Sequence, residues 1–161
     1  MSTLVIAEAG VNHNGDLATA RALVDAAVDA GADIVKFQTF GAASLGTATA
    51  PKAAYQERQL GQAGSQRSML ERLELDAAAH HTLVAHCKSA GIEFLSTAFD
   101  DASFDLLLGL NMARFKVPSG EITNLPLLRR VAAQRKPVIV STGMATLGDV
   151  EAALEALMQA G

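Results

Sequence analysis

The sequence predicts an α/β fold, a partial (β/α)8 TIM barrel of about five βα units with parallel strands. Short apolar runs alternate with stretches of helical periodicity along the whole chain. Two of the helical stretches end in Ala-Gly and lead at once into an apolar run. The chain has 161 residues, whereas a closed barrel needs about 250. These three observations favour part of a barrel over a complete one.

The predicted strands are short apolar runs of the kind that is buried on both faces of a parallel sheet. Strands that alternate with helices form parallel sheets, because a crossover helix returns the chain to the same edge. We expect strands over residues 3–9, 33–39, 92–98, 113–119 and 137–142.

The clearest predicted helix follows Asp16, a suitable N-cap residue, and stops at Gly31. Its apolar stripe consists of Leu17, Ala20, Val24, Ala27 and Val28. Further helices are expected at about residues 69–90, 102–109, 125–134 and 147–160. The connection 41–67 lacks strong periodicity, and loops of that length are usually functional lids or disordered.

The residues that end the predicted helices also indicate whether the barrel is complete. Ala30-Gly31 and Ala90-Gly91 each lead into a strand, whereas Gln159-Ala160-Gly161 ends the chain with the same stop and no strand after it. We therefore interpret residues 1–161 as the N-terminal part of a barrel domain. A complete five-stranded open sheet is the alternative.

The composition is typical of a folded domain, with 50% hydrophobic and 19% charged residues. A net charge of −4 argues against a surface for nucleic acid or anionic membrane. The N-terminus lacks the basic and apolar regions of a signal peptide. The single cysteine, Cys87, cannot form an internal disulfide, and we expect it to be a buried, inert thiol. A cytoplasmic protein is the expectation.

Polar residues stand where the chemistry of a barrel is found, at the carboxyl ends of the strands. Alternation in the run 33–39 places Lys36 and Gln38 on one face and Phe37 and Thr39 on the other. A lysine facing the helices would be a charge in an apolar layer. Facing inward, Lys36 would be a ligand-binding cation, and a lysine that extends outward from the strand end is the alternative.

The other predicted strands repeat this arrangement. Glu8 ends the first, Thr97 the third and Lys116 the fourth, and Ser141 and Thr142 end the fifth. Two lysines together with the hydroxyls of Thr97 and Ser119 and the amide of Gln38 suit a phosphate or carboxylate with hydroxyl groups nearby. Glu8 and Glu121 could transfer protons if burial raises their pKa.

Other candidate sites are weaker. His80, His81 and His86 lie on one predicted helix, but none has the i,i+4 spacing that shares a metal, so we interpret them as solvated or helix-packing residues. No cysteine pair suits zinc, and no Ser-His-Asp signature is present. Residues 10–15 match neither a Walker A nor a GxGxxG motif.

Six motifs occur in order along essentially the whole chain: IAEAGVNHNGD (6–16), ADIVKFQTF (32–40), APKAAYQ (50–56), FLSTAFD (94–100), FKVPSGEITNLPLL (115–128) and STGMAT (141–146). Together they resemble the N-acetylneuraminate (sialic acid) synthase family. The resemblance implies a TIM barrel followed by an antifreeze-like domain. It also implies condensation of phosphoenolpyruvate with an N-acetylated amino sugar aldehyde, such as N-acetylmannosamine, to a nine-carbon 2-keto acid with release of phosphate.

The resemblance assigns roles to the polar residues. Phosphoenolpyruvate is expected to contact Lys36, Thr97, Lys116 and Ser119. Gln38 is expected to contact the sugar. Glu8 corresponds to a glutamate near the reacting aldehyde and the metal, and Glu121 to a second active-site carboxylate, so both are candidate catalytic residues.

The resemblance also implies a divalent metal, Mn²⁺ or Mg²⁺, in the complete enzyme, and a homodimer. The family's metal-binding histidines come from later strands, so we expect no metal ligands, no later barrel units and no antifreeze-like domain in residues 1–161, and no activity of this chain alone. Another phosphoenolpyruvate-condensing synthase and a non-catalytic half-barrel binding module remain as alternatives.

Overall fold

The computed structural model describes residues 3–45 and 66–161. These residues form one parallel sheet of five strands in the order β1-β2-β3-β4-β5. The strands are β1 (Ile6–Gly10), β2 (Ile34–Thr39), β3 (Glu93–Ala98), β4 (Phe115–Val117) and β5 (Val138–Val140). A doubly wound open sheet reverses its strand order at a switch point. The sequential order is that of a barrel, so the prediction of a partial (β/α)8 barrel is confirmed.

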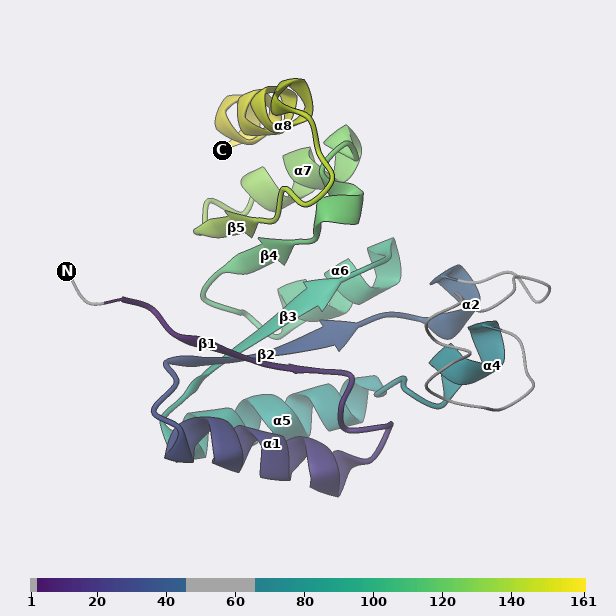
Figure 1. Cartoon of the computed structure of the whole chain (residues 1–161), viewed down its shortest axis with the longest axis vertical. Helices are drawn as coiled ribbons and strands as arrows, with labels where there is room; N and C mark the ends of the chain where they lie inside the picture. The colour runs from purple at the N-terminus through teal and green to yellow at the C-terminus, as the bar shows by residue number, and fades with distance from the viewer. Residues whose placement is uncertain (1–2, 46–65) are drawn as a thin grey trace.

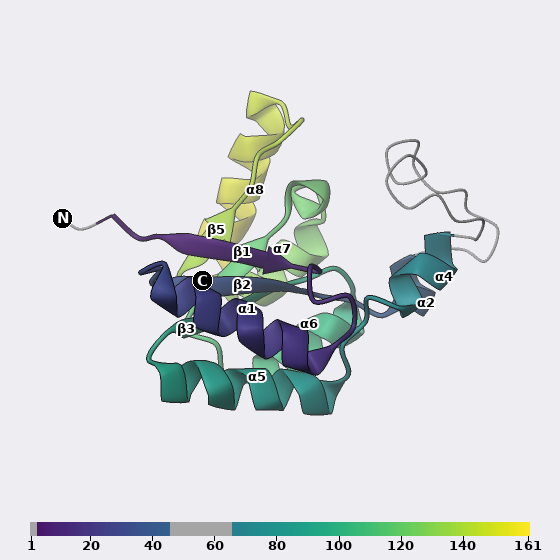
Figure 2. The ribbon, with the colours of Figure 1, turned by 60° about the horizontal axis from the view of Figure 1, so that its bottom comes forward.

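The helices of the described residues lie outside the curved sheet (Figures 1 and 2). They are α1 (Leu17–Asp29), α2 (Ala42–Leu45), α4 (Gln66–Glu71), α5 (Ala77–Ala90), α6 (Asp101–Gly109), α7 (Leu125–Ala132) and α8 (Leu147–Ala160), with a 3-10 turn at Ser119–Glu121. Figures 1 and 2 show α1 and α5 side by side below β1, β2 and β3. None of the helices in the described ranges is long and apolar enough to cross a membrane.

The caps of α1 are those that the sequence predicts. The Asp16 carboxylate accepts a hydrogen bond from the Thr19 amide at 2.6 Å, which satisfies one of the free donors at the start of the helix. At the other end Gly31 has φ +74°, the left-handed conformation that ends many helices. Gly91, with φ +77°, ends α5 in the same way. Both helices therefore turn directly into β2 and β3.

The prediction of one helix over 69–90 is wrong. The chain forms α4 and α5 instead, and α5 starts at Asp76, whose carboxylate accepts from the Ala79 amide at 2.7 Å. Leu73 and Leu75 continue the apolar pattern across the break, so no glycine or proline marks it. The predicted connection 41–67 also contains α2 and the start of α4. Motif 50–56 lies outside the described residues.

The strands β4 and β5 are three residues long, shorter than the predicted runs. Pro118 follows β4 directly and has no amide hydrogen to donate to a neighbouring strand. The chain then enters the 3-10 turn, which carries two of the predicted site residues, Ser119 and Glu121. The strand β4 therefore ends at Val117, and the 3-10 turn follows Pro118 directly.

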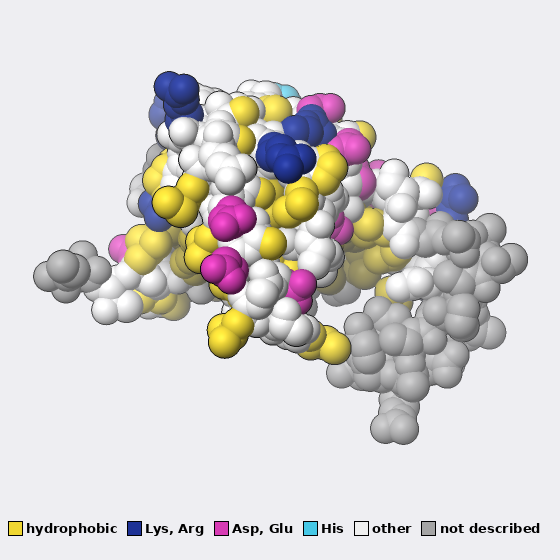
Figure 3. Space-filling view, turned by 90° about the horizontal axis from the view of Figure 1, so that it is seen from above, with side chains coloured by type: hydrophobic (Ala, Val, Ile, Leu, Met, Phe, Trp, Pro, Cys, Tyr) yellow, Lys and Arg dark blue, Asp and Glu magenta, His cyan; other side chains and the backbone are white. Residues whose placement is uncertain are grey.

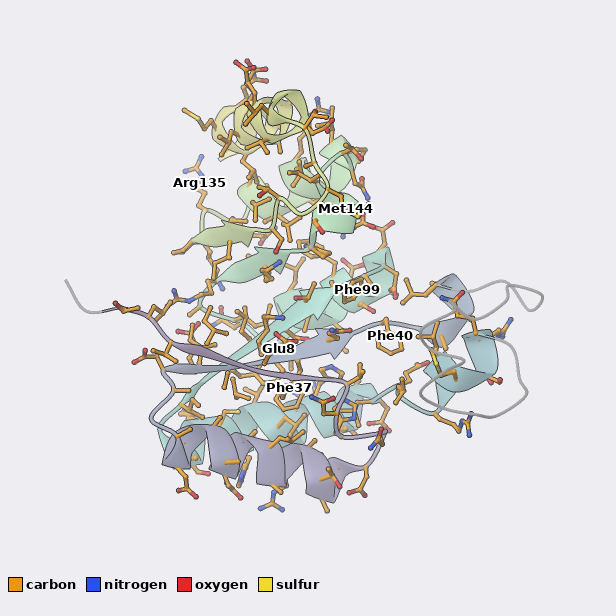
Figure 4. The ribbon with its side chains drawn as sticks, viewed as in Figure 1. Glu8, Phe37, Phe40, Phe99, Arg135 and Met144 are labelled. Atoms are coloured by element: carbon orange, nitrogen blue, oxygen red, sulfur yellow. The ribbon has the colours of Figure 1, made fainter. Side chains whose placement is uncertain are left out.

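The hydrophobic core lies between the sheet and the helices. Phe37 of β2 and Phe94 of β3 stack with ring centroids 5.7 Å apart, and Val24 of α1 and Leu83 of α5 are fully buried. Figure 4 shows Phe37 between the sheet and these two helices. Cys87 is also fully buried, as predicted, and burial raises the pKa of its thiol to about 12. It is therefore a packing residue.

The opposite, inner face of the sheet is more polar. At its amino-terminal edge Arg114 binds Glu93 through two hydrogen bonds, from Nε at 2.7 Å and from Nη2 at 3.0 Å. This fork geometry is the strongest form of an arginine–carboxylate pair. On the outside of the molecule, α8 exposes Leu147, Leu154 and Met158, whose spacing places them on one helix face. Figure 3, seen from above, shows hydrophobic side chains exposed on this side of the molecule.

The close approach of two loops gives a testable prediction about Gly15. A Cβ atom at Gly15, whose φ is +77°, would lie 2.2 Å from the backbone oxygen of Arg72. Gly31 has nearly the same φ, but nothing lies within 4 Å of its Cβ position. We expect Gly31→Ala to lower the free energy of unfolding by about 1–2 kcal/mol through backbone strain alone.

Gly15→Ala should cost about 3 kcal/mol or more, because overpacking adds to the same strain. Urea denaturation of the two variants measures the difference. Equal losses would show that the loop around Gly15 moves aside freely.

Candidate active site

The register of the sheet collects the predicted site residues on its inner face. Glu8 of β1 pairs with Lys36 of β2, while Gln38 of β2 pairs with Thr97 of β3, which in turn pairs with Lys116 of β4. Paired residues in a parallel sheet point to the same side. The five side chains therefore form two adjacent rows that run across four strands.

Lys36 and Glu8 form an ion pair at the first row. The side chain of Lys36 is 15% exposed and that of Glu8 is 49% exposed, so the lysine is held inside while the carboxylate is reached by solvent. Glu8 is labelled in Figure 4, on β1. The inward orientation that alternation predicted for Lys36 is the one observed, and the outward-pointing alternative is wrong.

Lys116 lies at the second row and is held by two acceptors. Its Nζ donates to the backbone oxygen of Val117 at 2.8 Å and to Ser141 Oγ at 2.5 Å. Burial lowers the pKa of Lys116, the positive charge of Lys36 lowers it further, and the Glu8 carboxylate acts in the opposite direction. The two ammonium groups are therefore close enough to repel each other.

A glycine makes room for the carboxylate. Gly10 follows a bulge in β1 and has φ +55°. A Cβ atom there would lie 3.2 Å from Glu8 Oε1 and 3.7 Å from Gln38 Nε2. The Glu8 carboxylate and the Gln38 amide therefore both lie next to the space that Gly10 leaves open.

Thr97 and Ser119 are the two hydroxyl residues of the predicted site. Thr97 is almost fully buried, with 2% of its surface exposed, and it lies between Gln38 and Lys116 in the register. Ser119 lies in the 3-10 turn after β4. Its Oγ would be 3.5 Å from a Cβ at Gly143, so the turns that follow β4 and β5 touch each other here.

Glu121 is the predicted residue that the structure does not bring into this group. Its carboxylate accepts from the Asn124 side chain at 2.7 Å. It lines a cavity of about 480 Å³ that opens beside the starts of α6 and α7. The other lining residues are Ser44, Phe99, Asp100, Asp101, Ala102, Asn124 and Leu127. The catalytic role of Glu121 stays a prediction.

Ser141 is a residue that the predicted site did not include. Sequence reasoning placed it at the end of the fifth strand, but its contact with Lys116 depends on the pairing of β4 with β5. Because its oxygen accepts from the lysine, its own hydroxyl hydrogen can be donated to a bound group. In the sequence, the feature that points to a role of Ser141 in the site is its position at the end of a strand.

The described residues do not form a metal site of their own. Among residues 3–45 and 66–161, no three His, Cys, Asp or Glu side chains converge to hold a metal ion. Glu8, the carboxylate nearest the lysines, is occupied by Lys36. What this face can do is bind an anion, because two ammonium groups share one carboxylate and several hydroxyl donors stand beside them.

Comparison with known proteins identifies the family of this chain. Residues 23–161 match the NeuB family. The chain belongs to that family. It is 52% identical over 159 residues to N,N'-diacetyllegionaminic acid synthase of Campylobacter jejuni, covering 99% of this chain and 48% of the relative. It is 49% identical to the Legionella pneumophila enzyme of the same name, covering 96% of this chain and 44% of the relative.

A solved structure shows the same fold. The N-acetylneuraminic acid synthetase of Leptospira borgpetersenii, solved in complex with citrate, superposes with a TM-score of 0.81 at 26% identity. The superposition covers 99% of this chain and 51% of that one. The chain thus spans about half the length of the relatives it matches.

The coupling of the three charged side chains can be tested by titration. We expect Lys36→Met to raise the pKa of Lys116, since a neighbouring positive charge is removed, and Glu8→Gln to lower it. The pKa of Lys116 can be followed by NMR of its side-chain nitrogen and adjacent carbon. Lys136→Met, which removes a lysine bound to Asn111 and Met112, should leave it unchanged. If neither Lys36→Met nor Glu8→Gln shifts the pKa of Lys116, the three charges do not interact.

Proposed function

We propose that this chain provides the phosphoenolpyruvate-binding part of a sialic acid synthase-type enzyme. The proposal rests on two lysines of the inner face, Lys36 and Lys116. The Glu8 carboxylate beside them can balance only one of their two positive charges. Two cations with adjacent hydroxyl and amide groups suit a small molecule that carries a phosphate and a carboxylate. Membership of the NeuB family supports this choice of ligand.

In the proposed reaction the methylene carbon of phosphoenolpyruvate forms a bond to the aldehyde carbon of the sugar, and the aldehyde oxygen takes up a proton. Water then adds to the neighbouring carbon. The bond from that carbon to the phosphate oxygen breaks, which leaves a nine-carbon 2-keto acid and free phosphate. Lys36, Lys116, Thr97 and Ser119 would hold the anionic groups during these steps, and Glu8 would face the reacting aldehyde.

Gln38 is proposed to contact the acceptor sugar, because its amide and the Glu8 carboxylate both lie next to the space that Gly10 leaves open. The acceptor would be an N-acetylated amino sugar aldehyde, either N-acetylmannosamine or a related sugar. Both relatives described above are named N,N'-diacetyllegionaminic acid synthases, which favours a diacetylated sugar. Glu121 is proposed as a second active-site carboxylate.

The proposal also includes a divalent metal and the oligomeric state of the complete enzyme. We propose that the divalent metal, Mn²⁺ or Mg²⁺, takes its ligands mainly from outside the described residues, since these offer no cluster of three. We also propose that the complete enzyme is a cytoplasmic homodimer.

Binding of phosphoenolpyruvate by this chain tests the anion site directly. We expect a measurable affinity by isothermal titration calorimetry at low salt. Lys116→Met should weaken it at least tenfold, because a charged hydrogen bond contributes about 1.5–3 kcal/mol. Lys136→Met removes an equal charge outside the site and should have little effect. If the unchanged chain fails to bind, or if both variants weaken binding equally, the inner face is not the site.

Catalysis by this chain alone is a separate test. With phosphoenolpyruvate, N-acetylmannosamine and Mn²⁺ present, we expect no release of phosphate, because the described residues offer no set of three metal ligands. A coupled phosphate assay measures this. Turnover that Lys116→Ala abolishes would show that residues 1–161 form a working active site, contrary to the proposal.

A further inference from the structure

Three buried polar side chains lie on the side of the sheet that faces the helices. Thr39 of β2, Ser96 of β3 and His80 of α5 are 3%, 1% and 1% exposed. His80 Nε2 lies 2.8 Å from Thr39 Oγ1, and Thr39 Oγ1 lies 2.7 Å from Ser96 Oγ. We call these three residues the His80 network. Nothing in the proposed reaction uses them.

The directions of these hydrogen bonds follow from the chemistry of the groups. His80 Nδ1 lies 2.8 Å from the backbone oxygen of Asp76, which can only accept, so Nδ1 carries the hydrogen. Burial lowers the pKa of His80 and favours the neutral ring. In that ring Nε2 accepts from the Thr39 hydroxyl, whose oxygen accepts in turn from Ser96. Each member of the network thus has one defined role.

The surroundings of His80 also favour a neutral ring. Repulsion from His81, on the same helix, also lowers the pKa of His80. His13, which is fully buried, has a pKa that burial lowers and that His80 lowers further. His13 Nδ1 accepts from the Gly15 amide at 3.0 Å, so this ring too is held in one tautomer. Asp76, at the start of α5, is the charge that acts in the opposite direction.

The His80 network lies directly behind two residues of the candidate site. Thr39 follows Gln38 in β2, and Ser96 precedes Thr97 in β3. Gln38 and Thr97 are register partners. Because successive side chains of a strand point to opposite faces, a bond that joins Thr39 to Ser96 on the outer face fixes the spacing of Gln38 and Thr97 on the inner face.

We propose that the His80 network positions Gln38 and Thr97 for substrate, so that His80 and Thr39 are positioning residues of the candidate site. The inference rests on the proposed function for its substrate. Apolar side chains would fill the same volume, as Phe37 and Phe94 do beside it, but apolar contacts are non-directional. Directed hydrogen bonds from α5 fix the helix and both strands in one relative position.

The experiment compares variants that differ by one hydroxyl group. Thr39→Val removes the hydroxyl and keeps the shape, whereas Thr39→Ser keeps the hydroxyl. Cys87→Ala is the matched control, because Cys87 is fully buried on the same helix and lies outside the network. For each variant of this chain we would record the NMR signals of the Gln38 side-chain amide and the Thr97 methyl without ligand, and the affinity for phosphoenolpyruvate.

We expect Thr39→Val to shift both signals and to weaken phosphoenolpyruvate binding about tenfold, which corresponds to the loss of about 1.4 kcal/mol. Thr39→Ser keeps the hydroxyl, so its NMR signals and its affinity for phosphoenolpyruvate should stay close to those of the unchanged chain. Cys87→Ala should lower the melting temperature and leave both readouts unchanged. If Thr39→Val does not fold, Ser96→Ala replaces it with the same expectations, because it removes the hydrogen that Thr39 accepts.

The outcomes separate the two proposals. Signals of Gln38 and Thr97 that stay in place in a folded Thr39→Val or Ser96→Ala protein would overturn the positioning role and leave the network as packing alone. Shifted signals in a chain that never binds phosphoenolpyruvate would support the positioning role and contradict the proposed function. Equal loss of affinity in Cys87→Ala would also overturn the inference, since general loosening of α5 would then explain it.

Discussion

Two ammonium groups and one carboxylate share the inner face of the sheet, and this unbalanced charge depends on the strand register. Lys36 and Lys116 repel each other, and Glu8 neutralises only one of them. A slip of one residue in any strand would turn its site residue toward the apolar core, where a lysine without a partner is strongly disfavoured. The charged face and the packing of the helices therefore require the same register, and the remaining positive charge attracts an anion.

Much of this arrangement follows from local patterns in the sequence. Alternation in β2 is enough to place Lys36 and Gln38 opposite Phe37 and Thr39, because a two-residue period allows no other division. The N-cap at Asp16 can be predicted for a similar reason, since a short polar side chain directly before an apolar helical stripe commonly caps the helix. Each of these predictions concerns residues within a few positions of one another.

The features that could not be predicted depend either on partners far along the chain or on a local break that the apolar pattern does not mark. The break before α5 was missed because Leu73 and Leu75 keep the helical pattern while Asp76 starts a new helix. The Ser141 contact needs the pairing of β4 with β5, and the placement of Glu121 depends on the turn that Pro118 forces at the end of β4. His80 looked like a packing residue, and its bonds to β2 and β3 appear only once α5 lies against the sheet.

The two faces of β2 and β3 are coupled by the geometry of a strand. Side chains on opposite faces alternate along one backbone, so a force that holds Thr39 and Ser96 on the outer face also limits the motion of Gln38 and Thr97 on the inner face. If Gln38 and Thr97 contact a substrate as proposed, their own donors and acceptors must stay available to it. The rigidity of these strands is therefore supplied on the outer face, where Thr39, Ser96 and His80 are hydrogen-bonded to one another in the buried layer between sheet and helix.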